Sequence, residues 1–223
     1  MELHYQKRLC QACEQRGIAL STTQLEELTH YLRLLVRWRP HLNLTGLRDA
    51  ERMLDVLIVE SLDFVQGDFF LPGMRVLDLG TGAGVPGIPL AICRPDVHVT
   101  LLDRSDKKIT FLRRVVASLP LANCQPCCST AEDLAHRLHP QEYFDVVVSR
   151  GVGSVAHLMH LTAPLLKPGG RLLLRKPLHT PELQEAESLR ASQTWGSIET
   201  LPLPWSASPT WALLAIVRGF EAP

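Results

Sequence analysis

Five short apolar runs alternate with helical stretches between Met74 and Lys176, and this alternation limits the possible folds more than any other feature. The runs read RVLDLG, HVTLLD, NCQPCC, YFDVVVSR and GRLLLRK. Helices are expected between them, at 86–93, 105–119, 130–138 and 154–166. Strands that alternate with helices at this spacing indicate a doubly wound, mostly parallel α/β sheet. Continuous apolar runs such as 146–148 fit strands that are covered on both faces.

The chain on either side of these runs has a different pattern. Residues 1–66 carry leucines at helical spacing, so a helical N-terminal extension is expected there, with its second half a helix from Asp49 to about Val65. Residues 67–223 are expected to form one compact domain, which adds a helix ending near residue 190 and two final strands. Pro126 lies inside the third apolar run and predicts an edge strand, because proline cannot donate a hydrogen bond to a neighbouring strand.

Composition excludes several classes of protein. The 223 residues are 46% hydrophobic and 21% charged with a formal net charge of zero, which argues against disorder, collagen and coiled coil. No apolar run reaches the roughly 18 residues of a membrane span. The N-terminal segment also lacks the apolar core of a secretion signal. We therefore expect a cytoplasmic protein with no membrane partner.

The six cysteines raise the question of a metal site. Cys10 and Cys13 form one C-x-x-C pair, and Cys124 and Cys127 form another. The first pair lies on an expected helix and the second on an expected strand, and neither has the glycines that are usual beside zinc ligands. Zinc binding is an alternative, but we expect no metal and reduced thiols that pack as small apolar groups.

The glycine-rich segment 78–87, DLGTGAGVPG, follows the first strand and opens a helix. Glycines let the backbone turn sharply and approach a ligand without interference from a Cβ atom. The last three glycines match the dinucleotide fingerprint G-x-G-x-x-G, so a nicotinamide-dependent oxidoreductase is one interpretation. Asp78 and Gly80 favour another, because a carboxylate at the end of the first strand repels a pyrophosphate and attracts a cation. A sulfonium cofactor with an amino-acid tail fits this pattern better.

Further candidate residues follow the next strands, at the sheet edge where such folds bind ligands. Asp103 ends the second strand, where a carboxylate can accept hydrogen bonds from both ribose hydroxyls; an ordinary helix cap is the alternative. Ala131 and Glu132 follow the third strand, beside the expected adenine pocket. Arg150 ends the fourth strand and is expected to face a carboxylate, a carbonyl or a phosphate.

Together these motifs resemble the class I S-adenosylmethionine-dependent methyltransferases, and among them the RsmG (GidB) family of bacterial enzymes that methylate N7 of one guanine in small-subunit ribosomal RNA. The segments that carry the resemblance are Asn43-Leu44-Thr45, the run GTGAGVPGIPL at 80–90, Leu101-Leu102-Asp103 and Ser149-Arg150. The resemblance implies a class I methyltransferase fold and S-adenosylmethionine as cofactor. It also implies 16S ribosomal RNA or the small ribosomal subunit as partner.

The resemblance implies specific cofactor contacts, at Gly80, Val85, Ala131, Glu132 and Arg150. To these the pattern of the glycine segment and the second strand adds Asp78, Gly82, Gly84 and Asp103. Guanine N7 already presents an in-plane lone pair, so no general base is expected. Arg150 is therefore expected to take part in catalysis by positioning.

One helix departs from the family pattern. Family members carry a basic residue and a histidine, followed by Asp and Ser, where this chain has Val56-Leu57 and Glu60-Ser61. A non-catalytic module that binds S-adenosylmethionine and RNA is therefore a further alternative.

Basic residues are concentrated before and within the fold, as RNA binding requires. The expected RNA-binding residues are Arg33, Arg37, Asn43, Arg48, Lys107, Arg113, Arg114 and, by the resemblance, Lys176. Solvated helix faces have the same composition, so the clusters alone leave both interpretations open. We expect a monomer with no DNA partner.

Overall fold

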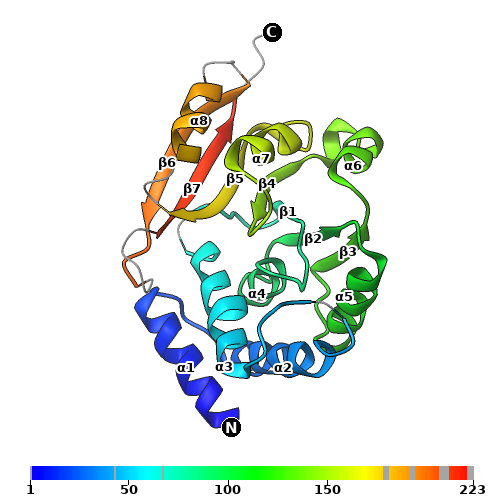
Figure 1. The fold of residues 1–223 in the computed structure, drawn as a ribbon, viewed down its shortest axis with the longest axis vertical. Helices are drawn as coiled ribbons and strands as arrows, with labels where there is room; N and C mark the ends of the chain where they lie inside the picture. Colours follow the sequence, from blue (N-terminus) through cyan, green and yellow to red (C-terminus); the bar gives the residue numbers. More distant parts are fainter. Residues whose placement is uncertain are drawn as a thin grey trace.

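A mostly parallel sheet forms the centre of the molecule (Figure 1). Within residues 2–42, 44–66, 68–177, 181–190, 194–205 and 211–219, which the computed structural model describes, the sheet has seven strands in the order β3-β2-β1-β4-β5-β7-β6. The strands are β1 Arg75–Leu79, β2 His98–Asp103, β3 Cys124–Cys128, β4 Phe144–Ser149, β5 Leu166–Pro177, β6 Trp195–Pro202 and β7 Trp211–Arg218. Neighbours from β3 to β5 pair in parallel, and β7 runs antiparallel to β5 and β6. The expected doubly wound, mostly parallel sheet is confirmed, and β3 with its Pro126 lies at the edge.

Helices cover both faces of this sheet. They are α1 Glu2–Gln15, α2 Thr22–Trp38, α3 Ala50–Met53, α4 Gly87–Cys93, α5 Asp106–Ser118, α6 Ala131–Arg137, α7 Val155–Thr162 and α8 Pro181–Arg190, with a short 3-10 turn η3 at Pro140–Glu142. The first five pack on one face, and α6, α7 and α8 pack on the other (Figure 1). The result is a three-layer α/β/α arrangement, which buries the apolar strands on both sides.

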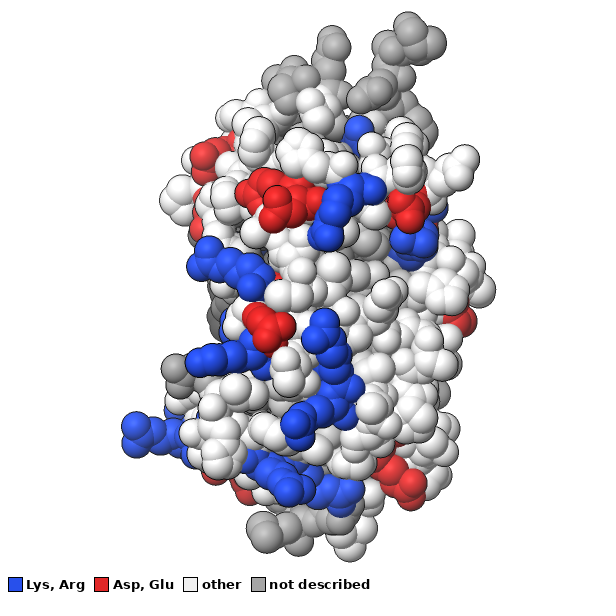
Figure 2. Space-filling model, turned by 90° about the vertical axis from the view of Figure 1, so that its right-hand side faces the viewer, with Lys and Arg blue, Asp and Glu red and all other residues white. Residues whose placement is uncertain are grey.

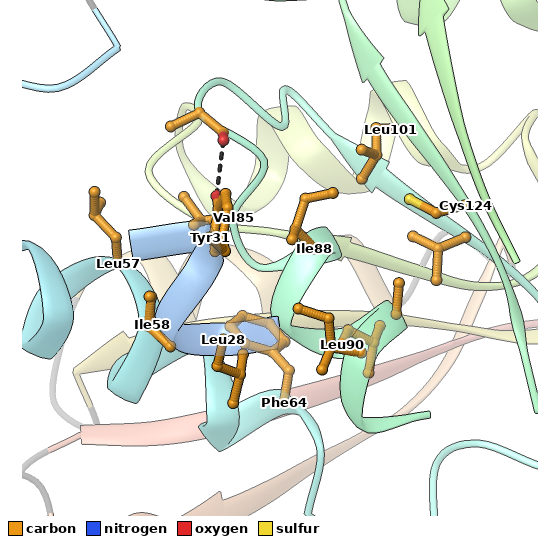
Figure 3. Packing of buried hydrophobic residues seen from close by; sticks show 14 of the residues in the cluster. Leu28, Tyr31, Leu57, Ile58, Phe64, Val85, Ile88, Leu90, Leu101 and Cys124 are labelled. Atoms are coloured by element: carbon orange, nitrogen blue, oxygen red, sulfur yellow. Dashed lines mark hydrogen bonds between the residues drawn. The ribbon is translucent and has the colours of Figure 1, made fainter. Parts of the chain in front are cut away.

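The N-terminal helices share a hydrophobic core with the sheet. One cluster of buried side chains includes Leu28 of α2, Phe64, Ile88 of α4 and Leu101 of β2 (Figure 3). Residue 66 therefore marks a change of secondary structure within this core. The helices before it form a layer of the fold.

The segment between Asp49 and Val65 is helical but irregular, whereas one regular helix was expected. After α3 it continues as the π-helix η1, Leu54–Ile58, and then as the 3-10 helix η2, Val59–Phe64. The hydroxyl of Ser61 donates to the carbonyl of Leu57 at 2.6 Å, a side-chain bond that competes with the regular main-chain ladder. The change of pitch alters the directions in which the acidic side chains of η2 point.

Candidate functional site

A cleft of about 550 Å³ opens at the carboxyl ends of β1, β2 and β4. The chain winds in opposite directions from β1 and β4, and ligands of open α/β sheets bind at such a switch point. Five of the expected cofactor residues line this cleft, namely Gly80, Asp103, Ala131, Glu132 and Arg150. Four different strand ends thus bring together residues that are far apart in the sequence.

Asp103 is held in place at the wall of the cleft, with only 7% of its surface exposed. One oxygen, Oδ2, accepts hydrogen bonds from the backbone N–H of Gly82 at 3.0 Å and from Nζ of Lys108 at 3.3 Å. The other, Oδ1, accepts from the N–H of Ser105 at 2.9 Å, at the start of α5. A carboxylate has about four acceptor positions, so it can also accept from a ligand. The N-cap residue of α5 is Ser105, so the structure does not support the alternative that Asp103 is an ordinary helix cap.

Gly80 must be glycine for two reasons. Its φ angle is +69°, which side chains other than glycine rarely adopt. A Cβ atom at this position would also lie 2.5 Å from Cγ2 of Val152, another residue of the cleft. The backbone of the loop therefore comes directly to the cleft wall.

Asp78 lies beneath the glycine loop and is fully buried. Its Oδ2 accepts a hydrogen bond from Oγ1 of Thr81 at 2.6 Å and another from the N–H of Gly87 at 2.8 Å. Burial raises the pKa of Asp78 to about 6, although these two hydrogen bonds oppose the shift. The sequence suggested that Asp78 holds a cationic cofactor through ordered water or an amino group. In the structure its side chain faces Thr81 and Gly87 and braces the loop from behind.

Three more of the expected cofactor residues also shape the loop from behind the wall: Gly82, Gly84 and Val85. Val85 is 9% exposed and packs in the hydrophobic core (Figure 3). A Cβ on Gly84, whose φ is +102°, would lie 2.7 Å from Cγ1 of Ile88. Gly84 and Val85 thus pack against neighbouring side chains, and the N–H of Gly82 donates to Oδ2 of Asp103 at the wall of the cleft. Their contact with the cofactor stays a prediction.

Tyr31 is a second brace of the loop, and the sequence analysis missed it. It is fully buried on α2, and its hydroxyl donates to the backbone carbonyl of Ala83 at 2.8 Å (Figure 3). In the sequence Tyr31 belongs to an apolar stripe with Leu28 and Leu35, which indicates a core position. The only available signal was its hydroxyl group, which needs a partner when buried.

Arg150 reaches from the end of β4 toward the helical segment 54–64. Its Nη1 donates to the carbonyl of Val56 and lies 3.6 Å from Oε2 of Glu60. The side chain is 14% exposed, and burial lowers the pKa of Arg150 while Glu60 raises it. Arg150 thus faces a carboxylate and a carbonyl of this chain, and its expected contact with the cofactor or the RNA stays a prediction.

The expected RNA-binding arginines and lysines are exposed on α2, on α5 and in the loop between α2 and α3. They are Arg33, Arg37, Arg48, Lys107, Arg113 and Arg114. Figure 2 views the side of α5 and α6, and its basic side chains gather in the lower half, where α5 lies. Arg33 and Arg37 also border a groove of about 430 Å³ between α1 and α2. Arg114 stacks over the ring of Trp38 at 4.9 Å.

Two of the expected RNA contacts need separate mention. Lys176 pairs with Glu182 at 2.8 Å and also donates to the carbonyl of Gly153 at 3.3 Å, so its ammonium group is already engaged. Asn43 lies outside the described residues.

The cysteines form no bridge or metal cluster in this structure. All six are free thiols, and the described residues contain no group of three His, Cys, Asp or Glu side chains that could hold a metal ion. Among the helices of the described part, none is both long and apolar enough to cross a bilayer.

Comparison with known structures agrees with the fold. The S-adenosylmethionine-dependent methyltransferase SibL superposes with a TM-score of 0.61 at 17% identity, over 87% of this chain and 70% of that one. The fibrillarin pre-rRNA processing protein of Methanococcus jannaschii gives a TM-score of 0.53 at 15% identity, over 71% of this chain and 74% of that one. At these identities the similarity establishes the class I methyltransferase fold and nothing finer.

Sequence comparison is more specific. A protein of Lachnoclostridium phytofermentans named ribosomal RNA small subunit methyltransferase G is 40% identical over 172 residues, which is 77% of this chain and 71% of that protein. The protein of the same name from Chromobacterium violaceum is 38% identical over 182 residues, or 82% of this chain and 84% of that protein. Residues 24–205 match the profile of the GidB family, described as rRNA small subunit methyltransferase G. The chain belongs to the GidB family.

Proposed function

We propose that this protein transfers the methyl group of S-adenosylmethionine to N7 of a guanine in 16S ribosomal RNA. One observation carries the proposal: in a chain of the GidB family, Gly80, Asp103 and Arg150 line a single cleft at the switch point of the sheet. The names of the relatives, ribosomal RNA small subunit methyltransferase G, support ribosomal RNA as the substrate. We further propose that it acts as a monomer in the cytoplasm.

The residues of the cleft fit S-adenosylmethionine by their chemistry. Asp103 offers carboxylate oxygens for ribose hydroxyls, and the start of α6, at Ala131 and Glu132, offers polar groups near an adenine. Gly80 lets the backbone of the loop lie at the cleft wall beside Val152, and Arg150 carries a positive charge for a carboxylate group. When bound there, S-adenosylmethionine supplies an electrophilic methyl group on a positively charged sulfur.

The residues of this chain then have to position groups and exclude water, with no proton to remove from the base. N7 of guanine has a lone pair in the ring plane, and alignment with the methyl donor is the demanding part of the reaction. Methylation leaves a positive charge on the purine, so a cation pressed against the ring would oppose it. Arg150 avoids this conflict because its guanidinium group points to Glu60 and to the carbonyl of Val56.

The basic surface supplies attraction for the RNA backbone. Arg104 and Lys108 line the cleft itself, and Lys107 and Arg113 are exposed farther along the same stretch of chain. Phosphate contacts fix the position of an RNA without selecting its sequence. This continuity between cleft and basic helix supports RNA over a small molecule as the methyl acceptor.

Two measurements test the proposal and separate it from the alternatives. Calorimetry should show saturable binding of S-adenosylhomocysteine and no binding of NAD, and the opposite result would support an oxidoreductase. Purified small ribosomal subunits should then accept a labelled methyl group, and mapping should place it on N7 of a single guanine. Binding of S-adenosylhomocysteine without transfer to subunits or to free 16S RNA would leave the non-catalytic module.

A further inference from the structure

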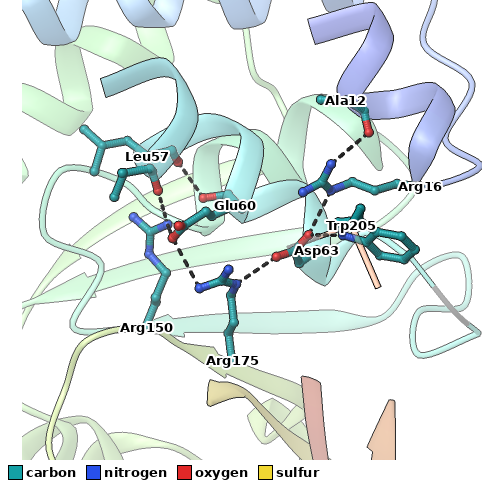
Figure 4. A network of polar contacts seen from close by, with 10 residues as sticks. Ala12, Arg16, Leu57, Glu60, Asp63, Arg150, Arg175 and Trp205 are labelled. Atoms are coloured by element: carbon teal, nitrogen blue, oxygen red, sulfur yellow. Dashed lines mark hydrogen bonds and ion pairs between the residues drawn. The ribbon is translucent and has the colours of Figure 1, made fainter. Parts of the chain in front are cut away.

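A cluster of five charged side chains joins the N-terminal helices to the strands beside the cleft (Figure 4). Its members are Arg16 of α1, Glu60 and Asp63 of η2, Arg150 at the end of β4, and Arg175 of β5. The cluster lies mostly in the interior, where charge pairs are screened less than at the surface. Only Arg150 of the five lines the cleft.

Asp63 is the fixed point of this cluster. Its carboxylate is fully buried and accepts hydrogen bonds from Nε of Arg16, Nε of Arg175 and Nε1 of Trp205, each at 2.8 Å. The guanidinium group of Arg175 also stacks over the ring of Trp211 at 4.3 Å. Arg175 is thus held on two sides and has little freedom to move.

Glu60 joins this fixed part to Arg150. Its Oε2 lies 3.3 Å from Nη1 of Arg175 and 3.6 Å from Nη1 of Arg150, so one carboxylate oxygen lies near two guanidinium groups. The cluster holds three cations and two carboxylates, and Glu60 is the only acid of the cluster within ion-pair distance of Arg150. Without its charge, two guanidinium groups would repel each other across this site, and only Arg150 borders open space into which it can move.

The irregular helix places two groups at the same guanidinium. The carbonyl of Val56 and the carboxylate of Glu60 are four residues apart on the segment that passes from η1 to η2, and both contact Nη1 of Arg150. One contact fixes the distance of the guanidinium group, and two fix its direction as well. Two of the positions that depart from the family pattern therefore contact Arg150, Val56 through its backbone carbonyl and Glu60 through its side chain.

We infer that Glu60 is a positioning residue, which holds Arg150 in the orientation that the cleft requires. This inference rests on the proposed function, since it assigns a role in the same cleft. Glu60 itself need not touch cofactor or RNA. Its effect passes through Arg150, and that dependence can be measured.

A double-mutant cycle tests this dependence with Glu60→Gln, Arg150→Ala and the double variant. Two quantities are measured: the affinity for S-adenosylhomocysteine by calorimetry and the single-turnover rate of methyl transfer to small ribosomal subunits. Glu60→Gln should lower at least one of them by about tenfold in the wild-type background. In the Arg150→Ala background the same substitution should change that quantity by less than about twofold.

Asp55→Asn is the matched control. Asp55 lies on η1 and pairs with Arg8 of α1 at 2.8 Å, so this variant also removes the charge of a carboxylate that joins the irregular helix to an arginine of another element. Asp55 does not line the cleft, and its variant should bind and react as the wild type does. If Glu60→Gln does not fold, Glu60→Asp keeps the charge but shortens its reach, and it takes the same place in the cycle with a smaller effect in the same direction.

Each outcome decides the question. Equal loss with and without Arg150 would show that Glu60 acts independently of Arg150, and wild-type behaviour of Glu60→Gln would show that Glu60 affects neither binding nor transfer. Tighter binding by Glu60→Gln would show that Glu60 competes with the ligand for Arg150, which also overturns the inference. Failure of the wild-type protein to bind S-adenosylhomocysteine would instead overturn the proposed function.

Discussion

Asp78→Asn tests whether the carboxylate beneath the glycine loop braces the loop while its buried charge lowers the stability of the fold. In the folded protein the pKa of Asp78 is raised from 3.8 to about 6, and burial is the main cause. Asparagine has nearly the same shape and keeps one oxygen to accept from Thr81 and Gly87. Its amide nitrogen would take the place of Oδ1, which has no hydrogen-bond partner among the described residues. The substitution therefore removes the buried charge and keeps the contacts.

The sign and size of the pH effect on the free energy of unfolding follow from proton linkage. Between pH 4 and pH 6 the folded state binds the proton of Asp78 more tightly than the unfolded chain, so this group destabilises the fold as the pH rises through that window. The shift of about two pH units corresponds to roughly 3 kcal/mol at about 1.36 kcal/mol per unit. Relative to wild type, the free energy of unfolding of Asp78→Asn should thus rise by up to about 3 kcal/mol from pH 4 to pH 7.5, with little further change above pH 7.

The assay is urea denaturation at several pH values between 4 and 8, with Asp96→Asn as the control for a carboxylate that does not titrate in this range. Arg94 lowers the pKa of Asp96 through a side-chain hydrogen bond, so Asp96 stabilises the fold at neutral pH and loses that effect in acid. Because Asp96 titrates below its ordinary pKa of 3.8, the free energy of unfolding of Asp96→Asn relative to wild type should stay nearly constant between pH 5 and pH 8. If the free energy of unfolding of Asp78→Asn relative to wild type does not change with pH, or changes as it does in the control, the reasoning is refuted.

Three further predictions concern the loop, the cofactor and the RNA. Tyr31→Phe should lower the free energy of unfolding in urea by about 1–2 kcal/mol, because a buried carbonyl of the glycine loop loses its donor; unchanged stability would exclude the brace. Asp103→Ala should weaken S-adenosylhomocysteine binding in calorimetry by about tenfold to a hundredfold through loss of a charge-assisted hydrogen bond, and unchanged affinity would remove Asp103 from the site. Lys107→Glu with Arg113→Glu should reduce the salt dependence of subunit binding by roughly 0.7–0.9 in logarithmic slope for each lost phosphate contact. Lys7→Glu on α1 is the control for charge reversal, and an equal loss in that variant would refute a localised RNA surface.

Local patterns in the sequence were sufficient to predict the sheet and one wall of the cleft. Apolar runs that alternate with helical stretches have few solutions, and Asp103 and Arg150 end strands whose carboxyl ends must share one edge. The contacts of Asp78 with the glycine loop could not be predicted in this way. Successive residues of a strand point to opposite faces, so contact with a ligand depends on how the loop after β1 folds back. The pattern of glycines does not specify that path.

The charge cluster could not be predicted because its contacts join distant parts of the chain. Arg150 and Val56 are 94 residues apart, and Arg175 and Asp63 are 112 apart. Pairing across such distances depends on the packing of the N-terminal helices on the sheet. The π turn at η1, which directs Val56 and Glu60 toward Arg150, also has no simple sequence signal.

The N-terminal helices hold the cleft at two separate places, and the proposed chemistry explains why that matters. Tyr31 of α2 bonds to the carbonyl of Ala83 on the glycine loop, and the segment 54–64 holds Arg150 on the other side of the switch point. A reaction without a general base depends on placement, and small errors of placement cost large factors in rate. Placement is most secure where supporting side chains are themselves fixed by packing. Tyr31 and Asp63 are both fully buried, so the helices that carry basic residues on their outer side also set the geometry of the cleft on their inner side.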